Sequence, residues 1–503
     1  MHRPLLQLYR QPRAPGIRFM RGVAPAFLRL SQRTGNADTS PVRWLEDGHH
    51  HFFLTGMVWI LVVLMIVPDG FDYSALIGGA GPTSGGAVSR LLWLLLLGIG
   101  FVTTTWRAGL AWLVLRWINP FLLVFAVLAF SSYLWSIEPT VTVKRLIRVF
   151  TIILDSFAFV LVGWNSLRFQ NALRPILTAM LLGSILFGLT FPELGIHQES
   201  SAELVGAWRG LTAHKNSLGA LSSVTLIFWV HAWLTGHARW IAALAGAAIA
   251  TTCLVLSRSS TSLVTSAFAI AFLLMFLRMP SNLYRYAPYL VGTFVALLLI
   301  YSLAILRLVP GLDIILSPIV ALTGKDLSFT SRSDIWAIVI EHVHLHPLLG
   351  TGYGAYWTGP IEGTPSFEFV VLMYFYPGSA HNGYLEIVND LGMVGLVCLI
   401  GYLITYVRQA LRLLTIDRNQ ATLYLCLFVQ QGISNLSESH WFSVMSVSFV
   451  IMTLATTCIA RALLDSRLRS YFSSNRDIAD KHTTDPAIFS ASPPSAEHDG
   501  TTA

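Results

Sequence analysis

Long apolar runs separated by short polar stretches organise most of this chain. A helix needs about 17–25 apolar residues to cross a bilayer, and twelve runs approach or reach that length. They lie at 52–68, 90–106, 119–136, 146–164, 173–191, 215–234, 239–257, 259–277, 288–309, 383–407, 420–437 and 441–463. The pattern predicts an all-α polytopic membrane protein with about twelve transmembrane helices.

The longest polar interruption, 310–381, is too long to be an ordinary connection. We expect it to contain short helices, one of them starting near Ser331. Ser331 or Ser333 can cap that helix, and Asp334 falls in its first turn, where a negative charge is favourable. A glycine-rich turn follows at 347–354. Its glycines would let the backbone approach a ligand or the membrane closely.

Basic residues gather in alternate loops, which orients the predicted helices by the positive-inside rule. With the N-terminus in the cytoplasm, the long loop lies in the periplasm and the C-terminus in the cytoplasm. The predicted division is a basic cytoplasmic segment at 1–51, helices one to nine at 52–309, a periplasmic catalytic loop at 310–381, helices ten to twelve at 382–463, and a disordered cytoplasmic tail at 464–503.

Composition agrees with a membrane protein. The 503 residues are 54% hydrophobic and only 12% charged, with a mean hydropathy of +0.62. The net charge of +7 is spread over many loops, so we expect no nucleic-acid partner.

The four cysteines all lie in apolar runs and are interpreted as small core residues. No apolar stretch precedes 52–68, so that helix is expected to act as an uncleaved signal anchor.

Eight basic residues are predicted to lie on the outer side, where the positive-inside rule disfavours them (the insertion bias). They are Lys144, Arg145, Arg148, Arg209, Lys215, Arg258, Lys325 and Arg332. Short outer loops tolerate a few positive charges, but such charges can also form a site for an anion, because guanidinium groups bind phosphate in a bidentate manner. Arg258 is the sharpest case: it lies in a tight hairpin between two spans, where a charge is costly unless it has a function.

Three further segments carry candidate chemistry. His381, followed by Asn382, is either an interfacial residue or a base for a sugar hydroxyl, a role that an imidazole side chain suits. Lys215 and Asn216 either form an ordinary helix start or bind phosphate or sugar at a helix N-terminus. Glu438 is a second candidate carboxylate near the site.

The sequence motifs give little support for a metal site or a nucleotide-binding site. His342 and His346 share a helix face, but a zinc site needs a third ligand. We therefore expect no metal and no cofactor. The sequence has no Walker A loop, no Asp-x-Asp-like site on an inner loop and no Gly-x-Ser-x-Gly elbow. An ATP-driven pump is disfavoured.

Several motifs together resemble the O-antigen ligase/polymerase family, which includes Wzy-type polymerases and WaaL-type ligases. Over about 240–400 they are Ser257-Arg258-Ser259, Arg332 with Trp336, 347–354, and His381-Asn382 with Gly392. The segments 134–139, 214–216 and 435–439 resemble the ExoQ-like exopolysaccharide-polymerase branch.

The resemblance implies a metal-independent, inverting glycosyltransferase of the GT-C type in a bacterial inner membrane, with a periplasmic active site. Its donor would be a glycan on undecaprenyl diphosphate. By matching position, Arg258 and Arg332 would hold the diphosphate and His381 would engage the acceptor hydroxyl. Preorganised arginines suit the charge that develops on this leaving group. Weaker phosphate candidates are Lys144, Arg145 and Lys215, with Arg209 as an alternative to Arg258.

Two activities in this family share the motifs. A polymerase joins lipid-linked repeat units, with or without a chain-length regulator, whereas a ligase transfers the glycan to lipid A–core. The 131–145 and 213–219 segments favour the polymerase. A third possibility is a flippase or export permease for lipid-linked sugars. A transporter would place polar residues in mid-span and show inverted repeats, whereas the unusual charges here gather at the outer surface.

Overall fold

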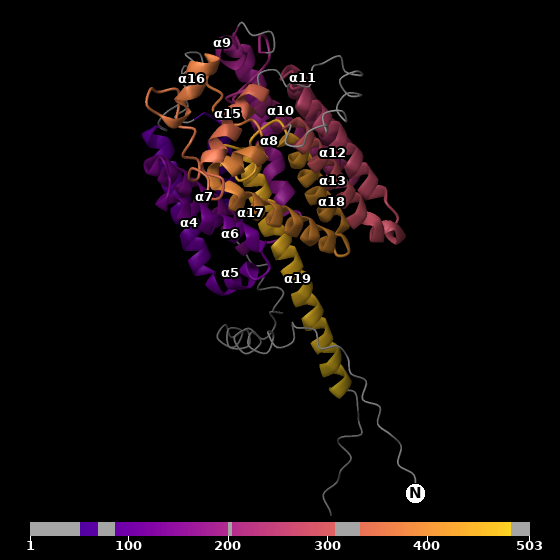
Figure 1. Ribbon diagram of the computed structural model, residues 1–503. Helices are drawn as coiled ribbons and strands as arrows, with labels where there is room; N and C mark the ends of the chain where they lie inside the picture. The colour runs from indigo at the N-terminus through magenta and orange to yellow at the C-terminus, as the bar shows by residue number, and fades with distance from the viewer. Residues whose placement is uncertain (1–50, 69–85, 200–203, 307–331, 484–503) are drawn as a thin grey trace, which may run out of the picture.

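The computed structural model describes residues 51–68, 86–199, 204–306 and 332–483 (Figure 1). Its elements are helices, with one isolated bridge between Ile196 and Trp208, so the expected all-α class is confirmed. The predicted segments 1–50, 310–331 and 484–503 lie outside the described residues. All four cysteines are free and buried, as expected of core residues.

The longer helices follow the order of the apolar runs. They are α3 (His51–Ile66), α4 (Ala87–Trp106), α5 (Ala108–Leu115), α6 (Pro120–Ser131), α7 (Pro139–Leu161), α8 (Arg168–Thr190), α10 (Lys215–Leu234), α11 (Trp240–Leu256), α12 (Ser260–Arg278), α13 (Ala287–Ile305), α15 (Arg332–Leu345), α17 (Gly383–Leu414), α18 (Arg418–Ser434) and α19 (Val447–Thr483). The short elements are η3 (Ser132–Leu134), α9 (Pro192–Gly195), η4 (Ser281–Tyr286), η6 (Pro365–Phe367) and α16 (Glu368–Met373).

Seven helices among the described residues are long and apolar enough to cross a membrane, and eight if the bent pair α5–α6 counts as one span. Two shorter apolar helices lie at Phe52–Ile66 and Trp240–Leu256. A multi-pass membrane protein is confirmed, whereas the count of twelve stays a prediction. The run at 119–136 contains only α6 and η3, and with α5 before it forms a pair bent by 103°. Asn119 caps α6 and Pro120 begins it, which stops α5 from continuing.

Several helix boundaries differ from the predicted ones. α7 begins at Pro139 rather than at 146, because proline is well suited to the first helical turn. Lys144 and Arg145 therefore lie on a helix and not in a loop. α19 begins at Val447 rather than at 441, and it continues to Thr483. The predicted tail is thus helical over 464–483, where no glycine or proline interrupts the helix.

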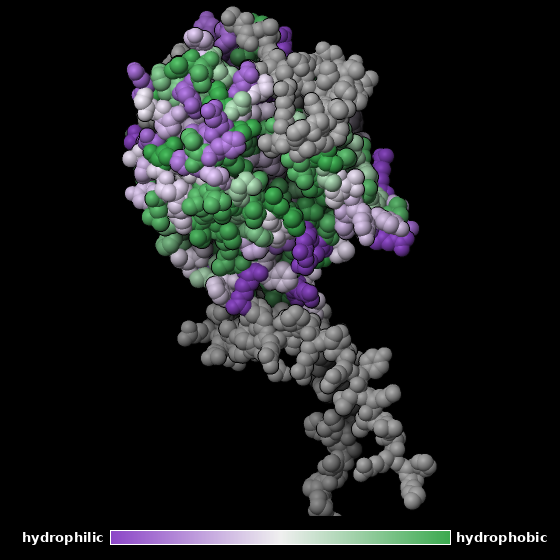
Figure 2. Space-filling view, viewed as in Figure 1, coloured by the Kyte–Doolittle hydropathy of each residue, from purple (hydrophilic) through white to green (hydrophobic). Residues whose placement is uncertain are grey.

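The helices form one bundle around α19, the most enclosed span, with 89% of its apolar window buried (Figure 1). On the face shown in Figure 2, apolar side chains cover the flank of the bundle and polar side chains gather towards its ends. Segments 132–138, 346–382 and 435–446 meet at one end, which we call the loop end. Trp135 Nε1 donates to Leu349 O at 3.0 Å, and Gly383 N donates to Asn435 O at 2.9 Å.

α17 is broken at Gly392, which has a φ of 64°. The segment 347–352 fills the break. Thr351 N donates to Asn389 O and Gly352 N donates to Asp390 O, both at 3.0 Å. In return, Met393 N donates to Pro347 O at 2.9 Å. The backbone groups that the break frees are therefore satisfied within the protein, as a membrane span requires.

The glycine-rich turn accordingly approaches protein, which corrects the expectation that it approaches a ligand or the membrane. A Cβ on Gly350 would collide with the backbone of Asp390, and one on Gly352 would collide with Ser136. A Cβ on Gly354 would collide with the side chain of Arg145. The turn fixes the long loop against α7 and α17, and so fixes the walls of the cavity described below.

Replacing Gly392 by alanine is expected to destabilise the protein. The positive φ alone costs about 1–3 kcal/mol for a residue with a Cβ, and that Cβ would also collide with the backbone of Leu348. The measurement is the thermal unfolding midpoint of the purified protein in detergent. Gly98→Ala is the matched control, because Gly98 lies in α4 with no atom within 4 Å of the added Cβ. Equal midpoints for the two variants would contradict the role given to the break.

Candidate active site

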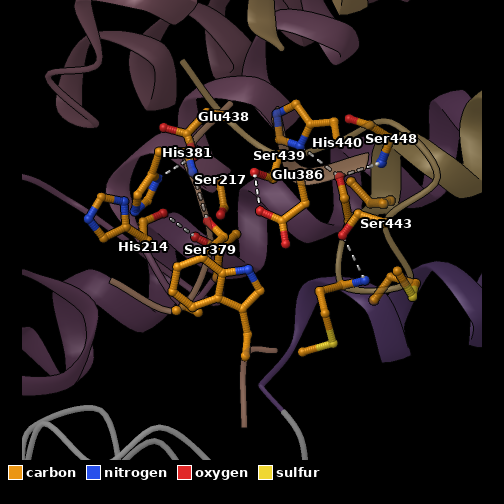
Figure 3. A pocket seen from close by; sticks show the side chains of 18 of the residues that line it. His214, Ser217, Ser379, His381, Glu386, Glu438, Ser439, His440, Ser443 and Ser448 are labelled. Atoms are coloured by element: carbon orange, nitrogen blue, oxygen red, sulfur yellow. Dashed lines mark hydrogen bonds and ion pairs between the residues drawn. The ribbon is translucent and has the colours of Figure 1, made fainter. Parts of the chain in front are cut away.

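A cavity of about 460 Å³ lies at the loop end. Its walls come from the last turn of α3, the first turns of α7, α10 and α17, and the segments 357–359, 376–381 and 438–448. Chain segments far apart in sequence thus meet around one polar space. Figure 3 shows His214, His381 and Glu438 at one side, His440 with Ser443 and Ser448 at the other, and Glu386 between them.

Glu438 connects the predicted site residues. Its Oε1 accepts a hydrogen bond from Arg332 Nη2 at 2.9 Å and one from Asn216 Nδ2 at 2.6 Å. Its Oε2 lies 3.4 Å from His381 Nδ1. Residues from α10, α15 and the start of α17 are therefore joined through one carboxylate. Four residues predicted from sequence, His381, Arg332, Asn216 and Glu438, are brought together.

The charges around Glu438 keep it ionised. Burial acts to raise the pKa of its carboxyl, but the hydrogen bond from His381 and the charges of His381 and Arg332 outweigh burial and hold the pKa well below its usual value. An ionised carboxylate only accepts hydrogen bonds, so His381 Nδ1 must carry the proton. When the imidazole is neutral, the other ring nitrogen, Nε2, is the acceptor that remains for a substrate hydroxyl.

Local structure explains why Glu438 and His381 meet. Asn435 ends α18, and its side-chain oxygen accepts from His440 N at 2.9 Å and from Trp441 N at 2.8 Å, which folds 435–441 into a tight turn. Gly383 packs directly on the Asn435 side chain, where no Cβ would fit. The His381 backbone, with a φ of 48°, is held in a conformation rare for a residue with a Cβ.

Asn382 has a structural task in this arrangement. Its side-chain oxygen accepts from Tyr384 N at 3.0 Å and Leu385 N at 3.1 Å, so it caps α17. It is 1% exposed and does not line the cavity. The cap fixes the direction of α17, and thereby of Glu386 one turn later.

His214 is the cap of α10 and lines the cavity beside Glu438. Burial lowers the pKa of His214 to about 3, against the opposing effect of Glu438, so its imidazole is neutral at physiological pH. His197, a residue that the sequence did not single out, supports this region: its Nε2 accepts from Lys215 N at 3.2 Å, and its Nδ1 lies 2.9 Å from Glu199.

The positively charged wall of the cavity belongs to α7. Lys144, Arg145 and Arg148 all line it. Arg145 Nη2 donates to Trp357 O at 2.8 Å, and Arg148 lies over the ring of Trp93 at 5.4 Å. The predicted phosphate candidates Lys144 and Arg145 are therefore at the cavity, together with a third cation one turn later.

Arg258, Arg209 and Lys215 do not line this cavity. Arg258 Nη1 donates to Val205 O at 3.0 Å from a backbone with a φ of 50°. Arg209 is 3% exposed; its Nε donates to Leu194 O at 2.7 Å and its Nη1 lies 3.8 Å from Glu199. Arg209 braces Leu194 and Arg258 braces Val205, on the described residues either side of 200–203. Arg332 also lies outside the cavity lining and reaches the site through Glu438.

His342 of α15 has local partners. His342 Nδ1 lies 3.1 Å from Asn389 Oδ1, and its ring lies 4.3 Å from that of Tyr356. In the part of the chain that the structure describes, no group of three or more His, Cys, Asp or Glu side chains is placed to hold a metal ion.

The cavity also contains two residues that were not among the predicted site residues. Glu386 lies on the first turns of α17 and His440 follows Glu438 in the turn at 435–446. The signal for Glu386 was a carboxylate one turn after a capping asparagine, at the mouth of an apolar run. Six serines also line the cavity: Ser217, Ser379, Ser439, Ser443, Ser446 and Ser448.

The fold and the cavity define a multi-pass membrane protein with a polar site at one end of its helix bundle. Residues 245–400 match the family described as O-Antigen ligase. The chain is 29% identical over 319 residues to the exopolysaccharide production protein ExoQ of Rhizobium meliloti (strain 1021), covering 60% of this chain and 67% of that protein. The two matches support assignment to the O-antigen ligase/polymerase family and confirm the ExoQ-like resemblance of the motifs. They also support a ligase/polymerase-type function.

Proposed function

We propose that this protein polymerises lipid-linked polysaccharide repeat units by inverting, metal-independent glycosyl transfer. The donor is a glycan on undecaprenyl diphosphate, the acceptor is a sugar hydroxyl, and the loop end faces the periplasm of a bacterial inner membrane. The observation that carries the proposal is the single cavity in which His381, oriented by Glu438, lies together with the cations of α7.

The reaction balances with the residues present. The acceptor hydroxyl oxygen attacks the anomeric carbon and its proton passes to His381 Nε2. The bond from that carbon to the diphosphate oxygen breaks, and the electron pair leaves with the lipid diphosphate. Lys144, Arg145 and Arg148 stabilise the charge on the leaving group. Arg332 acts through Glu438 as a positioning residue.

Orientation follows from charge. α7, α10 and α17 begin at the loop end, and each ends near basic residues: Arg168 after α7, Arg239 after α10, and Arg412 and Arg418 around the end of α17. Such residues are retained on the cytoplasmic side. The N- and C-termini then lie in the cytoplasm, and undecaprenyl chains reach the cavity from the surrounding lipid.

A ligase would use the same site with lipid A–core as the acceptor. The polymerase is favoured because the segments 131–145 and 213–219 resemble the ExoQ-like branch, and because the relative ExoQ is named as an exopolysaccharide production protein. A flippase for lipid-linked glycans would not need a histidine oriented by a carboxylate. A chain-length regulator is an optional partner of the polymerase.

The test uses purified protein in liposomes with lipid-linked repeat units extracted from a strain that lacks it. We expect lipid-linked chains of two and more units without any added acceptor, and an unchanged rate in EDTA, because the charges of α7 take the role of a divalent cation. Elongation only after addition of lipid A–core would indicate a ligase. Loss of activity in EDTA with recovery on adding a divalent cation would contradict the metal-independent mechanism.

A further inference from the structure

Glu386 is a buried carboxylate with one oxygen held by the protein. It is 8% exposed. Its Oε2 accepts from Ala380 N at 2.7 Å and from Ser439 Oγ at 3.1 Å. Oε1, by contrast, has no hydrogen-bond partner among the described residues, and it is not enclosed by protein atoms. In Figure 3 the Glu386 side chain extends into the cavity between His381 and His440.

A carboxylate near an apolar slab is costly to bury, and it is kept where it has a function. Only one of the two carboxylate oxygens of Glu386 accepts hydrogen bonds from the described residues, and each oxygen can accept about two. Hydroxyl groups are strong partners for a carboxylate oxygen. A sugar in the cavity would supply the missing partners.

Trp357 provides an aromatic surface in the same cavity. Its ring packs against Phe369 at 5.2 Å and Tyr376 at 6.3 Å, and Arg145 holds its carbonyl oxygen. A ring fixed in this way presents a rigid apolar face with a polar edge. Trp357 lines the cavity with the small part of its surface that is not enclosed, since it is 4% exposed.

His440 lines the cavity on the far side of Glu386. It is 9% exposed, and its Nδ1 lies 2.8 Å from Ser446 Oγ. Burial lowers the pKa of His440, against the opposing effect of Glu438, so the ring is neutral. A neutral ring adds no charge to this wall. An open carboxylate oxygen beside a fixed aromatic ring is suited to a polyhydroxylated ligand.

We propose that Glu386 and Trp357, with His440, form a sugar-binding subsite that holds the acceptor glycan beside His381. That the bound glycan is the acceptor rests on the proposed function. That the subsite binds a sugar does not, and it is tested by binding alone. Glu386 accepts a sugar hydroxyl at Oε1, and Trp357 covers an apolar face of the same ring.

The test measures binding without catalysis. The probe is the reducing oligosaccharide released by mild acid from the strain's own lipid-linked repeat units, and saturation-transfer NMR reports its binding to purified protein in detergent. We expect Glu386→Gln to weaken binding about 10-fold or more, since it replaces a charged acceptor. Trp357→Phe should weaken it less, because the aromatic face is retained.

Asp390→Asn is the matched control, because Asp390 is also a buried carboxylate of α17 but does not line the cavity. Unaltered binding by Glu386→Gln, equal loss in the Asp390 control, or no binding by the wild type would overturn the inference. Binding without elongation in liposomes would instead contradict the proposed polymerase and leave the subsite standing. Elongation without oligosaccharide binding would contradict the subsite alone.

Discussion

Replacing His381 by alanine is expected to lower the rate of chain elongation by about 10²–10⁴-fold, the usual contribution of a positioned general base. His381 is the titratable cavity residue whose ring is oriented by an ionised carboxylate. The measurement is the initial rate of elongation by purified protein in liposomes. The amount of inserted protein should stay near the wild-type level, because the side chain is partly exposed and fills no apolar core.

The matched control for this variant is His344→Ala. His344 is exposed on α15, and no contact of its side chain with the cavity is present. The control should elongate at the wild-type rate. An equal loss in both variants would show that the effect comes from folding, and an active His381→Ala protein would remove His381 from the mechanism.

Replacing Glu438 by glutamine is expected to reduce elongation by about 100-fold or more, because the neutral side chain no longer fixes the protonated nitrogen of His381. The same change removes the charge that Arg332 pairs with at 2.9 Å. The variant should therefore also unfold at a lower temperature, since a cation at a partly buried site loses its partner. Both quantities are measured on the purified protein.

The pH dependence has a definite sign. The folded-state pKa of Glu438 lies below its ordinary value of 4.5, so its stabilising charge is fully present above that value and is lost only as the pH falls through the folded pKa. Wild-type stability should thus keep the Glu438 contribution at pH 5, and the Glu438→Gln variant should show less stability at pH 5 and 7 alike. Glu341→Gln, on the exposed face of α15, is the control. A wild-type loss of this contribution between pH 7 and 5 would contradict the pairing.

Much of the fold could be predicted because periodicity and length determine a membrane helix locally. The apolar runs coincide with helices, and the helix near Ser331 begins at Arg332. The break at Gly392 could not be foreseen, since it depends on hydrogen bonds from 347–352, a segment separated by many residues. Likewise, the chain changes direction between α5 and α6 because Asn119 caps α6. A hydropathy average along the sequence does not detect such a cap.

The site was predictable as a set of residue types more than as an arrangement. The basic exceptions to the insertion bias included Lys144 and Arg145, which line the cavity, but also Arg209 and Arg258, which bind backbone carbonyls. Charge alone does not tell these cases apart. Glu438 was chosen as a nearby carboxylate, whereas its pairing with Arg332 and His381 depends on three helices meeting. Glu386 needed the structure, because its role depends on which oxygen the protein leaves unpaired.

The most direct measurement is a glycan profile of a deletion strain complemented with the wild type or with His381→Ala, separating carrier-linked, lipid A–linked and secreted material. Our account predicts long chains with the wild type, and single repeat units stalled on the lipid carrier with His381→Ala. Long chains that accumulate on the carrier in the His381→Ala strain would contradict it, because polymerisation would then proceed without this site.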